Sequence, residues 1–302
     1  MGEAQILLQE PLSKHTTFRI GGPCDFFVRI KKDEELCDVL ALCKQEAVPY
    51  FLIGNGSNLL VCDEGLAGVV LKLEETDSSL IILEETPETV TVSVGAGMNL
   101  SAFAMKVAKQ SLTGFEFAAG IPGSVGGAVY MNAGAYGGTI KDCLQSVKVV
   151  IEDGKIITLD KEELQLGYRK SLLQTKNILV LSAVFTFKRG DYASIRSKIE
   201  ELNAQRKEKQ PLEYPSAGST FKRPEGYFAG KLIMDAGLRG YRVGNAMVSE
   251  KHCGFVINTG GATAHDVCQR MEDVSRIVYE KFGVILEPEV KYISNTSSIR
   301  KQ

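Results

Sequence analysis

The sequence has no tryptophan, three histidines and nine prolines among its 302 residues. It also lacks any apolar run of about 18 residues, the length that a membrane-spanning helix requires. Charge of one sign is not in excess, because 35 Lys and Arg stand against 37 Asp and Glu, with a net charge of −2. A protein that binds nucleic acid regardless of base sequence needs a basic excess. These absences argue against a membrane protein and against a bulk nucleic-acid binder.

Disulfide and metal frameworks are missing as well. The seven cysteines are odd in number and none forms a Cys-x-x-Cys pair, which favours free thiols in a reducing compartment. Of the three histidines, His252 has a cysteine neighbour, but no further ligand follows at regular spacing, so we expect no metal site. The N-terminal segment carries early acidic residues and no long apolar core, unlike a secretory signal. We therefore expect a cytoplasmic protein.

Hydrophobic periodicity predicts a mixed α and β chain. We expect helices over 34–47, 100–110, 192–209 and 263–281, and strands over 50–53, 89–94, 178–187 and 284–286, with a hairpin over 145–159. The 192–209 segment is highly charged, yet it keeps Ile195, Ile199 and Leu202 at helical spacing. This pattern predicts a solvated helix that links two domains, with the boundary near 190–210.

Glycine, with 30 residues, is plentiful and concentrates in loops. The first cluster, GNGSN, comprises Gly54, Asn55, Gly56, Ser57 and Asn58, directly after the predicted strand YFLI. Such a loop brings backbone N–H groups close to an anion and suits a phosphate or pyrophosphate. It is neither a Walker loop, because no Gly-Lys-Ser/Thr follows, nor a G-x-G-x-x-G turn, because the third glycine is missing. An ordinary tight turn remains the alternative.

A second glycine-rich run extends from Gly120 to Gly138 and predicts a long irregular backbone. The residues expected to offer backbone amides to a pyrophosphate are Gly123, Ser124, Gly126 and Gly127. Asn132 and Tyr136 offer polar or stacking contacts to the same ligand. Two separate glycine loops in one domain indicate a dinucleotide held between two subdomains. Without a Rossmann fingerprint, this favours a flavin over a Rossmann-type nicotinamide site.

Three further residues suggest chemistry: Arg169 in LGYRKS, Ser219 in SAGSTFKRP and Glu289 in LEPEV. Taken singly, they are typical of a surface cation, a helix cap and a carboxylate at the end of a strand. A shared reaction requires them to converge in space, and spacing along the chain does not decide this.

The motifs together resemble a known family. The chain is similar to UDP-N-acetylmuramate dehydrogenases, also called UDP-N-acetylenolpyruvoylglucosamine reductases. The resemblance runs nearly end to end, in family order, through HTTFRIGGP (15–23), GNGSN (54–58), GIPGSVGGAVYMNAGAYG (120–137), GYRKS (167–171), PSAGSTFKRP (215–224), AGKLIMDAGLRGYRVGNAMVSEKHCGFVINTG (229–260) and LEPEV (286–290).

The resemblance implies an α+β fold: an FAD-binding domain of the p-cresol methylhydroxylase (PCMH) type with two subdomains, then a smaller α/β substrate domain. The domains would span 1–192 and 193–302, the last 15 or so residues returning to the FAD domain. The chain looks like the compact subclass without the extra capping loop. The implied FAD-binding residues are Gly54, Asn55, Gly56, Ser57, Asn58, Gly120, Ile121, Pro122, Gly123, Ser124, Gly126 and Gly127.

The implied activity is NADPH-dependent reduction of the enolpyruvyl ether of UDP-N-acetylglucosamine, through non-covalent FAD, for peptidoglycan precursor synthesis. Arg169 would hold the substrate carboxylate, a protonated Glu289 would donate to the developing charge, and Ser219 would supply a proton. Tyr168, Lys222 and Arg223 would bind substrate, although many relatives have Asn where this chain has Arg223. We expect a monomer.

Two rival classes are weighed against this interpretation. A related oxidase would attach its flavin covalently to a His or Cys beside a glycine loop, and Cys62 follows the first loop. A non-catalytic nucleotide-sugar binder would keep the glycine loops without needing Arg169, Ser219 and Glu289 together. The presence of all three disfavours the second rival.

Overall fold

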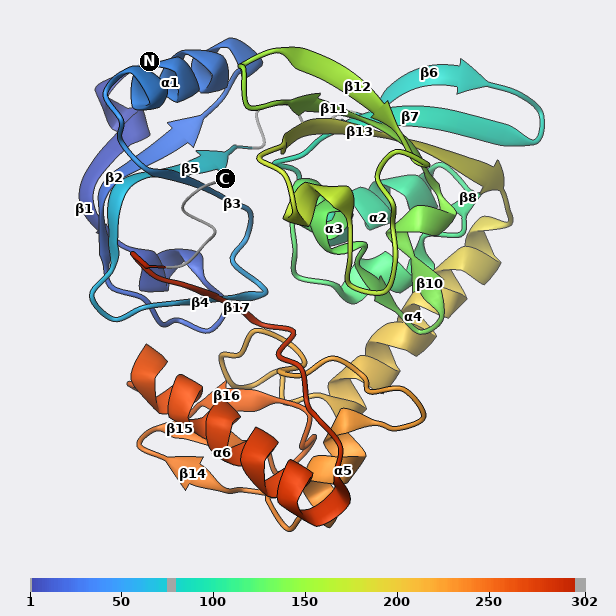
Figure 1. Cartoon of the computed structure of the whole chain (residues 1–302). Helices are drawn as coiled ribbons and strands as arrows, with labels where there is room; N and C mark the ends of the chain where they lie inside the picture. The colour runs from blue at the N-terminus through green and yellow to red at the C-terminus, as the bar shows by residue number, and fades with distance from the viewer. Residues whose placement is uncertain (1, 75–79, 297–302) are drawn as a thin grey trace.

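The structure, a computed structural model, describes residues 2–74 and 80–296. The chain forms two sheet-containing parts side by side and a third part below them (Figure 1). The first part is a four-stranded sheet of order β1-β2-β5-β3, in which only the β1–β2 pair is antiparallel. Its strands are β1 (Ile6–Pro11), β2 (Pro23–Ile30), β5 (Leu66–Leu73) and β3 (Tyr50–Ile53).

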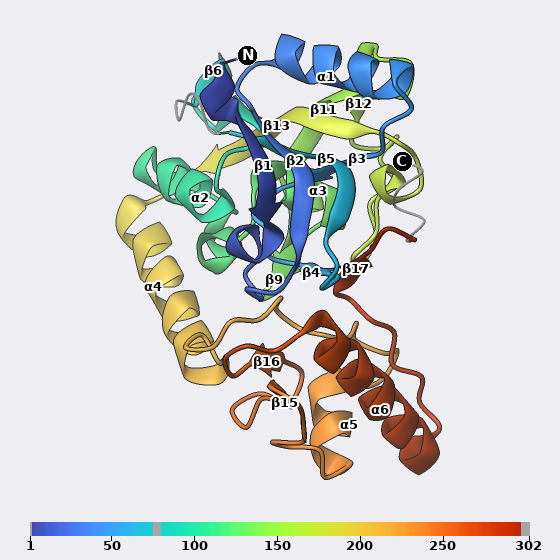
Figure 2. The ribbon, with the colours of Figure 1, turned by 90° about the vertical axis from the view of Figure 1, so that its left-hand side faces the viewer.

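One helix connects β2 to β3 and covers this first sheet. Helix α1 (Asp33–Gln45) opens with three acidic residues, which suit the positive end of a helix dipole. Its apolar stripe, including Leu36, Leu40 and Cys43, is buried against β2 and β5. Figure 2 shows β1, β2, β5 and β3 side by side in this order. This helix and sheet place the loop after β3 at one end of the first part.

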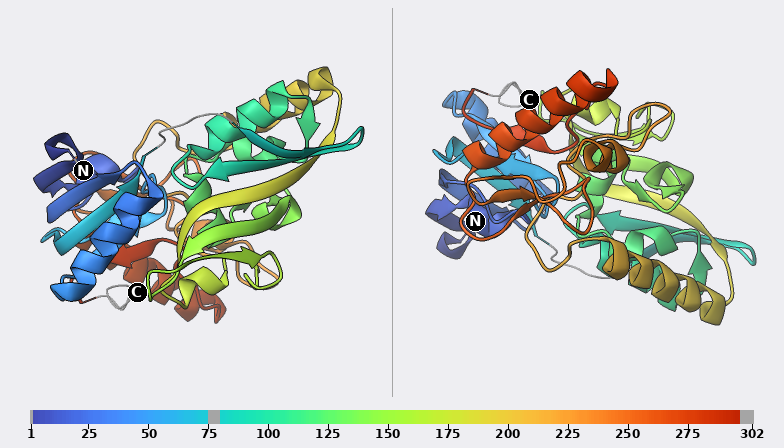
Figure 3. Two further views of the ribbon diagram at one scale, coloured as in Figure 1. Left: turned by 90° about the horizontal axis from the view of Figure 1, so that it is seen from above. Right: turned by 90° about the horizontal axis from the view of Figure 1, so that it is seen from below.

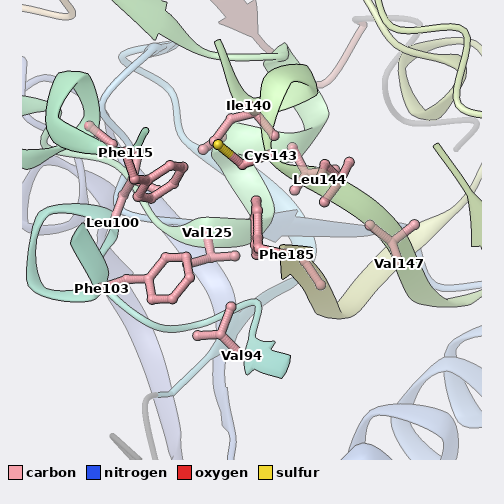
Figure 4. Close-up of a cluster of buried hydrophobic side chains, with 14 of the residues drawn as sticks. Val94, Leu100, Phe103, Phe115, Val125, Ile140, Cys143, Leu144, Val147 and Phe185 are labelled. Carbon is pink, nitrogen blue, oxygen red and sulfur yellow. The ribbon is translucent and has the colours of Figure 1, made fainter. Parts of the chain in front are cut away.

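The second part is a larger antiparallel sheet of order β12-β11-β13-β7-β6, with β8 also paired to β13. Helices α2 and α3 lie on one face of it (Figure 3). Its core includes Phe103, Phe115, Phe185 and Phe187, whose ring centroids lie 5.2–6.0 Å apart. Figure 4 shows part of this core, with Phe103, Phe115 and Phe185 labelled. The main elements are β6 (Ile81–Glu85), β7 (Thr89–Gly95), α2 (Leu100–Lys109), β8 (Leu112–Thr113), α3 (Val125–Met131), β11 (Leu144–Val150), β12 (Ile156–Asp160) and β13 (Leu179–Arg189).

The third part follows the long helix α4 (Tyr192–Lys209), which descends beside the second part (Figure 1). It is a small antiparallel sheet packed with two helices. Its elements are α5 (Ala229–Asp235), β14 (Arg242–Val243), β15 (Ala246–Val248), β16 (Val256–Asn258) and α6 (Ala264–Phe282). The chain then returns, and β17 (Lys291–Ile293) pairs in parallel with β4 (Leu59–Val61), directly after the GNGSN loop.

Short elements complete the connections. The 3₁₀ turns are η1 (Glu3–Gln5), η2 (Leu12–His15), η3 (Glu116–Gly120), η4 (Ile140–Asp142) and η5 (Leu172–Gln174), and a two-residue hairpin joins β9 (Gly134–Ala135) to β10 (Gly138–Thr139). No helix in the described residues is long and apolar enough to cross a membrane. All seven cysteines are free.

Most of the expected elements form. The helices over 34–47, 100–110, 192–209 and 263–281 correspond to α1, α2, α4 and α6. Asn99 caps α2 by accepting from the amide of Ala102 at 3.0 Å. The strands over 50–53, 89–94 and 178–187 and the hairpin over 145–159 are β3, β7, β13 and β11–β12.

Two expectations are wrong. The segment 284–286 is not a strand: no neighbouring strand pairs with it, and the first bridge comes later, between Phe221 and Pro288. The run from Gly120 to Gly138 is not irregular throughout, because α3 forms within it. Ser124 caps α3 by accepting from the amide of Gly127, and buried Val125 and Val129 anchor the helix despite its glycines.

Candidate active site

A cavity of about 690 Å³ lies where the three parts meet. Its wall includes the end of β3, both glycine segments, the loop before Ser219, and Glu289. This volume is within the range typical of ligand pockets. Among the described residues that line the cavity, none is a histidine or a cysteine. No cluster of three potential metal ligands occurs in the described part of the chain.

The two glycine segments are fitted against each other and against neighbouring backbone. A β-carbon on Gly54 would lie 2.2 Å from the Oγ of Ser124, so the first loop contacts the cap of α3. Gly56 has a φ of +62° and its β-carbon would lie 2.1 Å from the carbonyl oxygen of His15. Gly56 therefore requires glycine for both space and backbone conformation, whereas a side chain at position 54 would require Ser124 to move.

The cavity wall offers free hydrogen-bond donors. Within residues 2–74 and 80–296, the backbone N–H groups of Asn55, Gly56, Ser57 and Gly123 donate to no protein acceptor, and all four residues line the cavity. Unpaired backbone amides that converge in a concave loop are suited to a phosphate or pyrophosphate. The residues present thus fit the pyrophosphate of a dinucleotide.

The predicted FAD-binding residues lie on this wall with one exception. Of these, the residues that line the cavity are Gly54, Asn55–Asn58, Ile121–Ser124, Gly126 and Gly127. Gly120 does not, and the β-carbon that it lacks would face Asn203 and Arg206 of α4. The absence of a side chain at Gly120 lets η3 pack closely against α4.

Arg169 and Glu289 form an ion pair on the cavity wall. The Nε of Arg169 donates to the Oε1 of Glu289 at 2.6 Å, and its Nη2 donates to the carbonyl of Gly134 at 3.1 Å. Glu289 is 9 % exposed. Burial raises the pKa of this carboxyl above its ordinary value, outweighing the Arg169 guanidinium, which lowers it. The pair therefore combines a permanent cation with an acid that holds its proton more tightly than usual.

Ser219 reaches the same cavity through backbone pairing with the Glu289 segment. The amide of Glu289 donates to the carbonyl of Thr220 at 2.8 Å, and the amide of Lys222 donates to the carbonyl of Glu287 at 2.8 Å. These bonds fix the segment after Ser219 antiparallel to the one that carries Glu289. The structure thus brings Arg169, Ser219 and Glu289 to one cavity from three separate places in the sequence.

The predicted substrate-binding residues Tyr168, Lys222 and Arg223 do not line this cavity. Arg223 is exposed; its amide donates to the hydroxyl of Tyr168 at 3.2 Å, and its guanidinium lies 3.9 Å from the ring centroid of Phe228. Lys222 is paired with Glu287 at 3.0 Å. Tyr168 and Arg223 are therefore in contact outside the cavity. In the sequence, Tyr168 precedes Arg169, and Lys222 and Arg223 follow shortly after Ser219.

Sequence reasoning missed several polar residues of the wall. Arg206, from α4, and Gln210, just after it, line the cavity, and the side chain of Arg206 has no hydrogen-bond or ion-pair partner among the described residues. Thr17 also lines it and donates through its hydroxyl to the carbonyl of Ser216 at 2.7 Å. The HTTFRIGGP motif contains Thr17, but nothing in the local pattern indicates the approach of α4.

Asn132 and Tyr136, which were expected to contact the ligand, lie away from the cavity wall. Neither lines the cavity. Asn132 is 4 % exposed and uses its side chain on two backbone groups, and Tyr136 is 44 % exposed. The expectation failed because Asn132 ends α3 with a left-handed backbone, which turns its side chain toward the loop at 167–170.

Comparison with known proteins agrees with this geometry. Residues 24–160 match a family model described as an FAD binding domain, and residues 210–293 match one described as the UDP-N-acetylenolpyruvoylglucosamine reductase C-terminal domain. The predicted α+β fold class, an FAD-binding domain of two subdomains followed by a smaller domain, is confirmed. The chain is thus an FAD-binding oxidoreductase.

Whole-chain relatives define the family. A UDP-N-acetylenolpyruvoylglucosamine reductase of Lachnoclostridium phytofermentans is 64 % identical, over 96 % of this chain and 93 % of its own. One of Caldanaerobacter subterraneus subsp. tengcongensis is 50 % identical, over 96 % and 94 %. The crystal structure of the Thermus caldophilus enzyme, 36 % identical, covers 96 % of this chain and 98 % of its own, with a TM-score of 0.80. The chain belongs to the UDP-N-acetylenolpyruvoylglucosamine reductase family, as its motifs predicted.

Proposed function

We propose that this protein reduces the enolpyruvyl ether of UDP-N-acetylglucosamine to UDP-N-acetylmuramate, with NADPH as the reductant and FAD as the bound cofactor. The product is a precursor of bacterial cell-wall peptidoglycan. The observation that supports this proposal best is the convergence of Arg169, Ser219 and Glu289 on the cavity that both glycine segments line.

FAD, when bound, supplies hydride transfer between NADPH and the alkene. The GNGSN loop would hold its pyrophosphate through the free amides of Asn55, Gly56 and Ser57, and Gly123 would contribute a further amide. Ile121, Pro122, Ser124, Gly126 and Gly127 would complete this side of the cradle. The lack of His and Cys among the described lining residues supports non-covalent binding.

Arg169 would hold the substrate carboxylate. Its Nε and Nη2 are already used, and Nη1 has no acceptor among the described residues. Addition of hydride to the far carbon of the alkene leaves negative charge shared with this carboxylate. A fixed guanidinium beside the charge stabilises it without reorganisation. Glu289 must be protonated to donate a hydrogen bond to the same charge, and burial raises its pKa in the direction that this role requires.

Ser219 would give its hydroxyl proton to the carbon next to the carboxylate and so complete the reduction. Its side chain has no hydrogen-bond partner within the described residues, so the hydroxyl is free to face a ligand. A general acid of this kind contributes about 10²–10⁴-fold to a rate. Hydride and proton together account for the two hydrogens that the alkene gains.

The remaining parts of the proposal concern the diphosphate and the domains. Lys222, Arg223 and Tyr168 would bind the diphosphate of the substrate beside the mouth of the cavity, with Arg223 as a charged clamp. The FAD domain would span 1–192 and the substrate domain 193–302. The pairing of β17 with β4 supports a terminal segment that returns to the FAD domain. We further propose a cytoplasmic monomer.

The test is to follow both half-reactions by stopped-flow absorbance. Wild-type protein should be yellow and should oxidise NADPH over many turnovers only when the enolpyruvyl nucleotide is present. Ser219→Ala should leave reduction of the bound cofactor by NADPH nearly intact and should slow its reoxidation by the nucleotide about 10²–10⁴-fold. Equal slowing of both steps would make Ser219 a binding or folding residue. Folded, colourless protein that takes up no FAD would refute the proposal.

The rival oxidase is separated by acid precipitation. The proposal predicts that all flavin appears in the supernatant, since no lining residue among those described provides a thiol or imidazole. Flavin that remains with the pellet would favour the covalent oxidase.

A further inference from the structure

Arg169 has an uncommon backbone conformation. It is the second residue of a two-residue turn, closed by hydrogen bonds from the amide of Gly167 to the carbonyl of Lys170 at 3.0 Å and from the amide of Lys170 to the carbonyl of Gly167 at 3.3 Å. Its φ is +53°, in the left-handed region that side chains with a β-carbon disfavour. Strained residues of this kind persist only where their surroundings hold them.

Asn132 holds the first side of this turn. It lies at the end of α3 with a φ of +41°, and its Nδ2 donates to the carbonyl of Gly167 at 2.8 Å. Its Oδ1 accepts from the amide of Lys141 at 3.0 Å. One partner can only accept and the other can only donate, so the orientation of the amide is fixed by its partners. Asn132 is 4 % exposed and does not line the cavity.

The segment that carries Asn132 also holds the other end of Arg169. Two residues later, the carbonyl of Gly134 accepts from Nη2 of Arg169 at 3.1 Å. The turn that contains Arg169, through the Gly167 carbonyl, and the Arg169 guanidinium are therefore both hydrogen-bonded to 132–134, while Nε donates to Glu289. A shift of this segment relative to the turn would change the position and direction of the guanidinium.

We propose that Asn132 is a positioning residue for Arg169, which it holds in the geometry that recognises the substrate carboxylate. This inference rests on the proposed function, because that function gives Arg169 its ligand. Asn132 acts through the Gly167 carbonyl and touches neither cofactor nor substrate. Its loss should therefore reduce turnover of the enolpyruvyl nucleotide more than it reduces binding or reduction of the cofactor.

The most informative variant is Asn132→Asp. The carboxylate keeps an acceptor for the Lys141 amide but places a charged oxygen against the Gly167 carbonyl. At neutral pH we expect at least a tenfold loss of kcat for the nucleotide, with cofactor reduction by NADPH within about twofold of wild type. When the carboxyl is protonated it again donates to Gly167, so the ratio of variant to wild-type kcat should rise as pH falls. Asn132→Ala should lose kcat without this recovery.

The charged groups on the segments that hold Asn132 are Lys141, Asp142, Arg169 and Lys170, with Glu289 paired to Arg169. The Lys141 ammonium donates to the carbonyl of Leu166 at 3.4 Å, away from the amide of Asn132. Arg169 and Glu289 are common to wild type and variants, so taking the ratio of kcat values at each pH isolates the titration of the introduced carboxyl.

A second measurement does not depend on turnover. The Arg169 guanidinium lowers the pKa of Glu289. In FAD-loaded protein labelled with ¹³C at glutamate side-chain carboxyls, Asn132→Ala should raise the pKa of Glu289 further, because Arg169 moves away. An unchanged Glu289 pKa would overturn the inference even in an active enzyme. Absence of any nucleotide-dependent turnover in wild type would instead contradict the proposed function.

Gln5→Glu provides the matched control. Gln5 is also buried, at 8 % exposed, and its Nε2 donates to a backbone carbonyl, that of Arg29, at 2.9 Å and to Oε2 of Glu35 at 3.1 Å. It lies on the first sheet and does not line the cavity. The same amide-to-carboxyl change there should lower stability and leave kcat unchanged at every pH. If Asn132→Asp behaves like this control, Asn132 has a structural role alone and the inference is wrong.

Discussion

Arg270 is a buried charged residue that we expect to lower the stability of the protein. It lies on α6, is fully buried, and its three guanidinium nitrogens have no hydrogen-bond partner among the described residues. Its guanidinium lies 3.8 Å from the ring centroid of Tyr241, so a cation–π contact is its main favourable interaction. Burial lowers the pKa of Arg270, which reflects the cost of removing the charge from water.

We predict that Arg270→Met makes the protein more stable. Replacement of buried charges by well-packed apolar residues is often neutral or stabilising, and we expect a gain of about 1–2 kcal/mol in the free energy of unfolding, measured in urea. Arg276→Met is the control, since Arg276 is on the same helix with its side chain 58 % exposed, and should change stability by less than about 0.5 kcal/mol. A large loss of stability in Arg270→Met would show that the cation–π contact outweighs desolvation.

Glu289 should give the protein a pH-dependent stability. Its folded pKa is raised above the ordinary value of 4.5, so between the unfolded and folded pKa values the native state keeps a proton that the unfolded chain has released. The free energy of unfolding therefore falls as pH rises through this window. As pH rises above about 4, where the carboxyl of the unfolded chain ionises, Glu289→Gln should become more stable relative to wild type, while losing nucleotide-dependent turnover.

Denaturant unfolding at several pH values checks this prediction. Glu287→Gln is the control, because the side chain of Glu287 is 70 % exposed and the change should have the same small effect at each pH. A stability difference between Glu289→Gln and wild type that grows as pH falls would contradict the direction in which burial moves the pKa of Glu289.

At the scale of single residues, the motifs singled out three residues of different chemical types, and the structure shows where they lie. Arg169, Ser219 and Glu289 stand out as a cation, a hydroxyl and a carboxylate in motifs, and the structure places them at one cavity. Asn132 was misread because a polar residue in a glycine-rich run suggests a ligand contact. Its side chain instead bonds to the carbonyl of Gly167 and the amide of Lys141. Every residue type has a backbone carbonyl, and nearly all have an amide, so the sequence does not indicate these partners.

Among elements, the loop after β3 and the cap of α3 depend on each other. The β-carbon of an alanine at position 54 would lie 2.2 Å from Ser124 Oγ, the atom that accepts from the amide of Gly127 at 3.2 Å. Gly54→Ala should therefore move one glycine segment away from the other and separate the amides that face the cavity. We predict at least tenfold weaker FAD binding, measured by quenching of flavin fluorescence.

Gly95→Ala is the matched control for this prediction. Gly95 ends β7, has nothing within 4 Å of its absent β-carbon, and does not line the cavity. The alanine should bind FAD as wild type does. Equal FAD affinity in Gly54→Ala would mean that Ser124 can rotate away without cost and that the two segments are not coupled.

Elements could be predicted when the residues that stabilise them lie within the element itself. The helices α2 and α6 carry their own caps and apolar stripes, and both were predicted to within about two residues at each end. Residues 284–286 are as apolar as a strand, but a strand needs a partner, and none is adjacent to this segment. α3 was missed because its seven residues include two glycines, and buried Val125 and Val129 compensate only in the folded core.

For the whole molecule, the cavity makes stability depend on the cofactor. All three parts of the chain contribute to its wall, so FAD bound there would contact groups that the unfolded chain does not bring together. Ligand at 100 times its dissociation constant stabilises the native state by about 2.7 kcal/mol. We predict that removal of FAD lowers the melting temperature by several degrees and that added FAD restores it in a concentration-dependent way.

Thermal scans of FAD-free protein with FAD, and with riboflavin as control, test this. Riboflavin lacks the pyrophosphate that the free amides of Asn55, Gly56 and Ser57 would bind, so it should give a much smaller rise in melting temperature. Equal rises with both compounds would show that these amides contribute little to binding.

The sequence predicted two glycine loops and a second part, but not how they are joined. Contacts between the parts are specific and distant in sequence: Asp63 accepts from the amides of Ala264 and His265 at the start of α6, and Asn258 donates to the carbonyl of Phe18 at 3.1 Å. Each of these residues is unremarkable in its own segment. Their pairing depends on the tertiary arrangement, which spacing alone does not determine.

The return of β17 to β4 has a consequence for how the protein is made. During synthesis the N-terminal portion of a chain folds first, yet β4 has its parallel partner only after the whole C-terminal part has been translated. Glu289, just before β17, arrives equally late. A nascent chain therefore passes through a stage with a structured front half and an open cleft. Flavin uptake should be among the last events of biogenesis, when the final strand has closed that cleft.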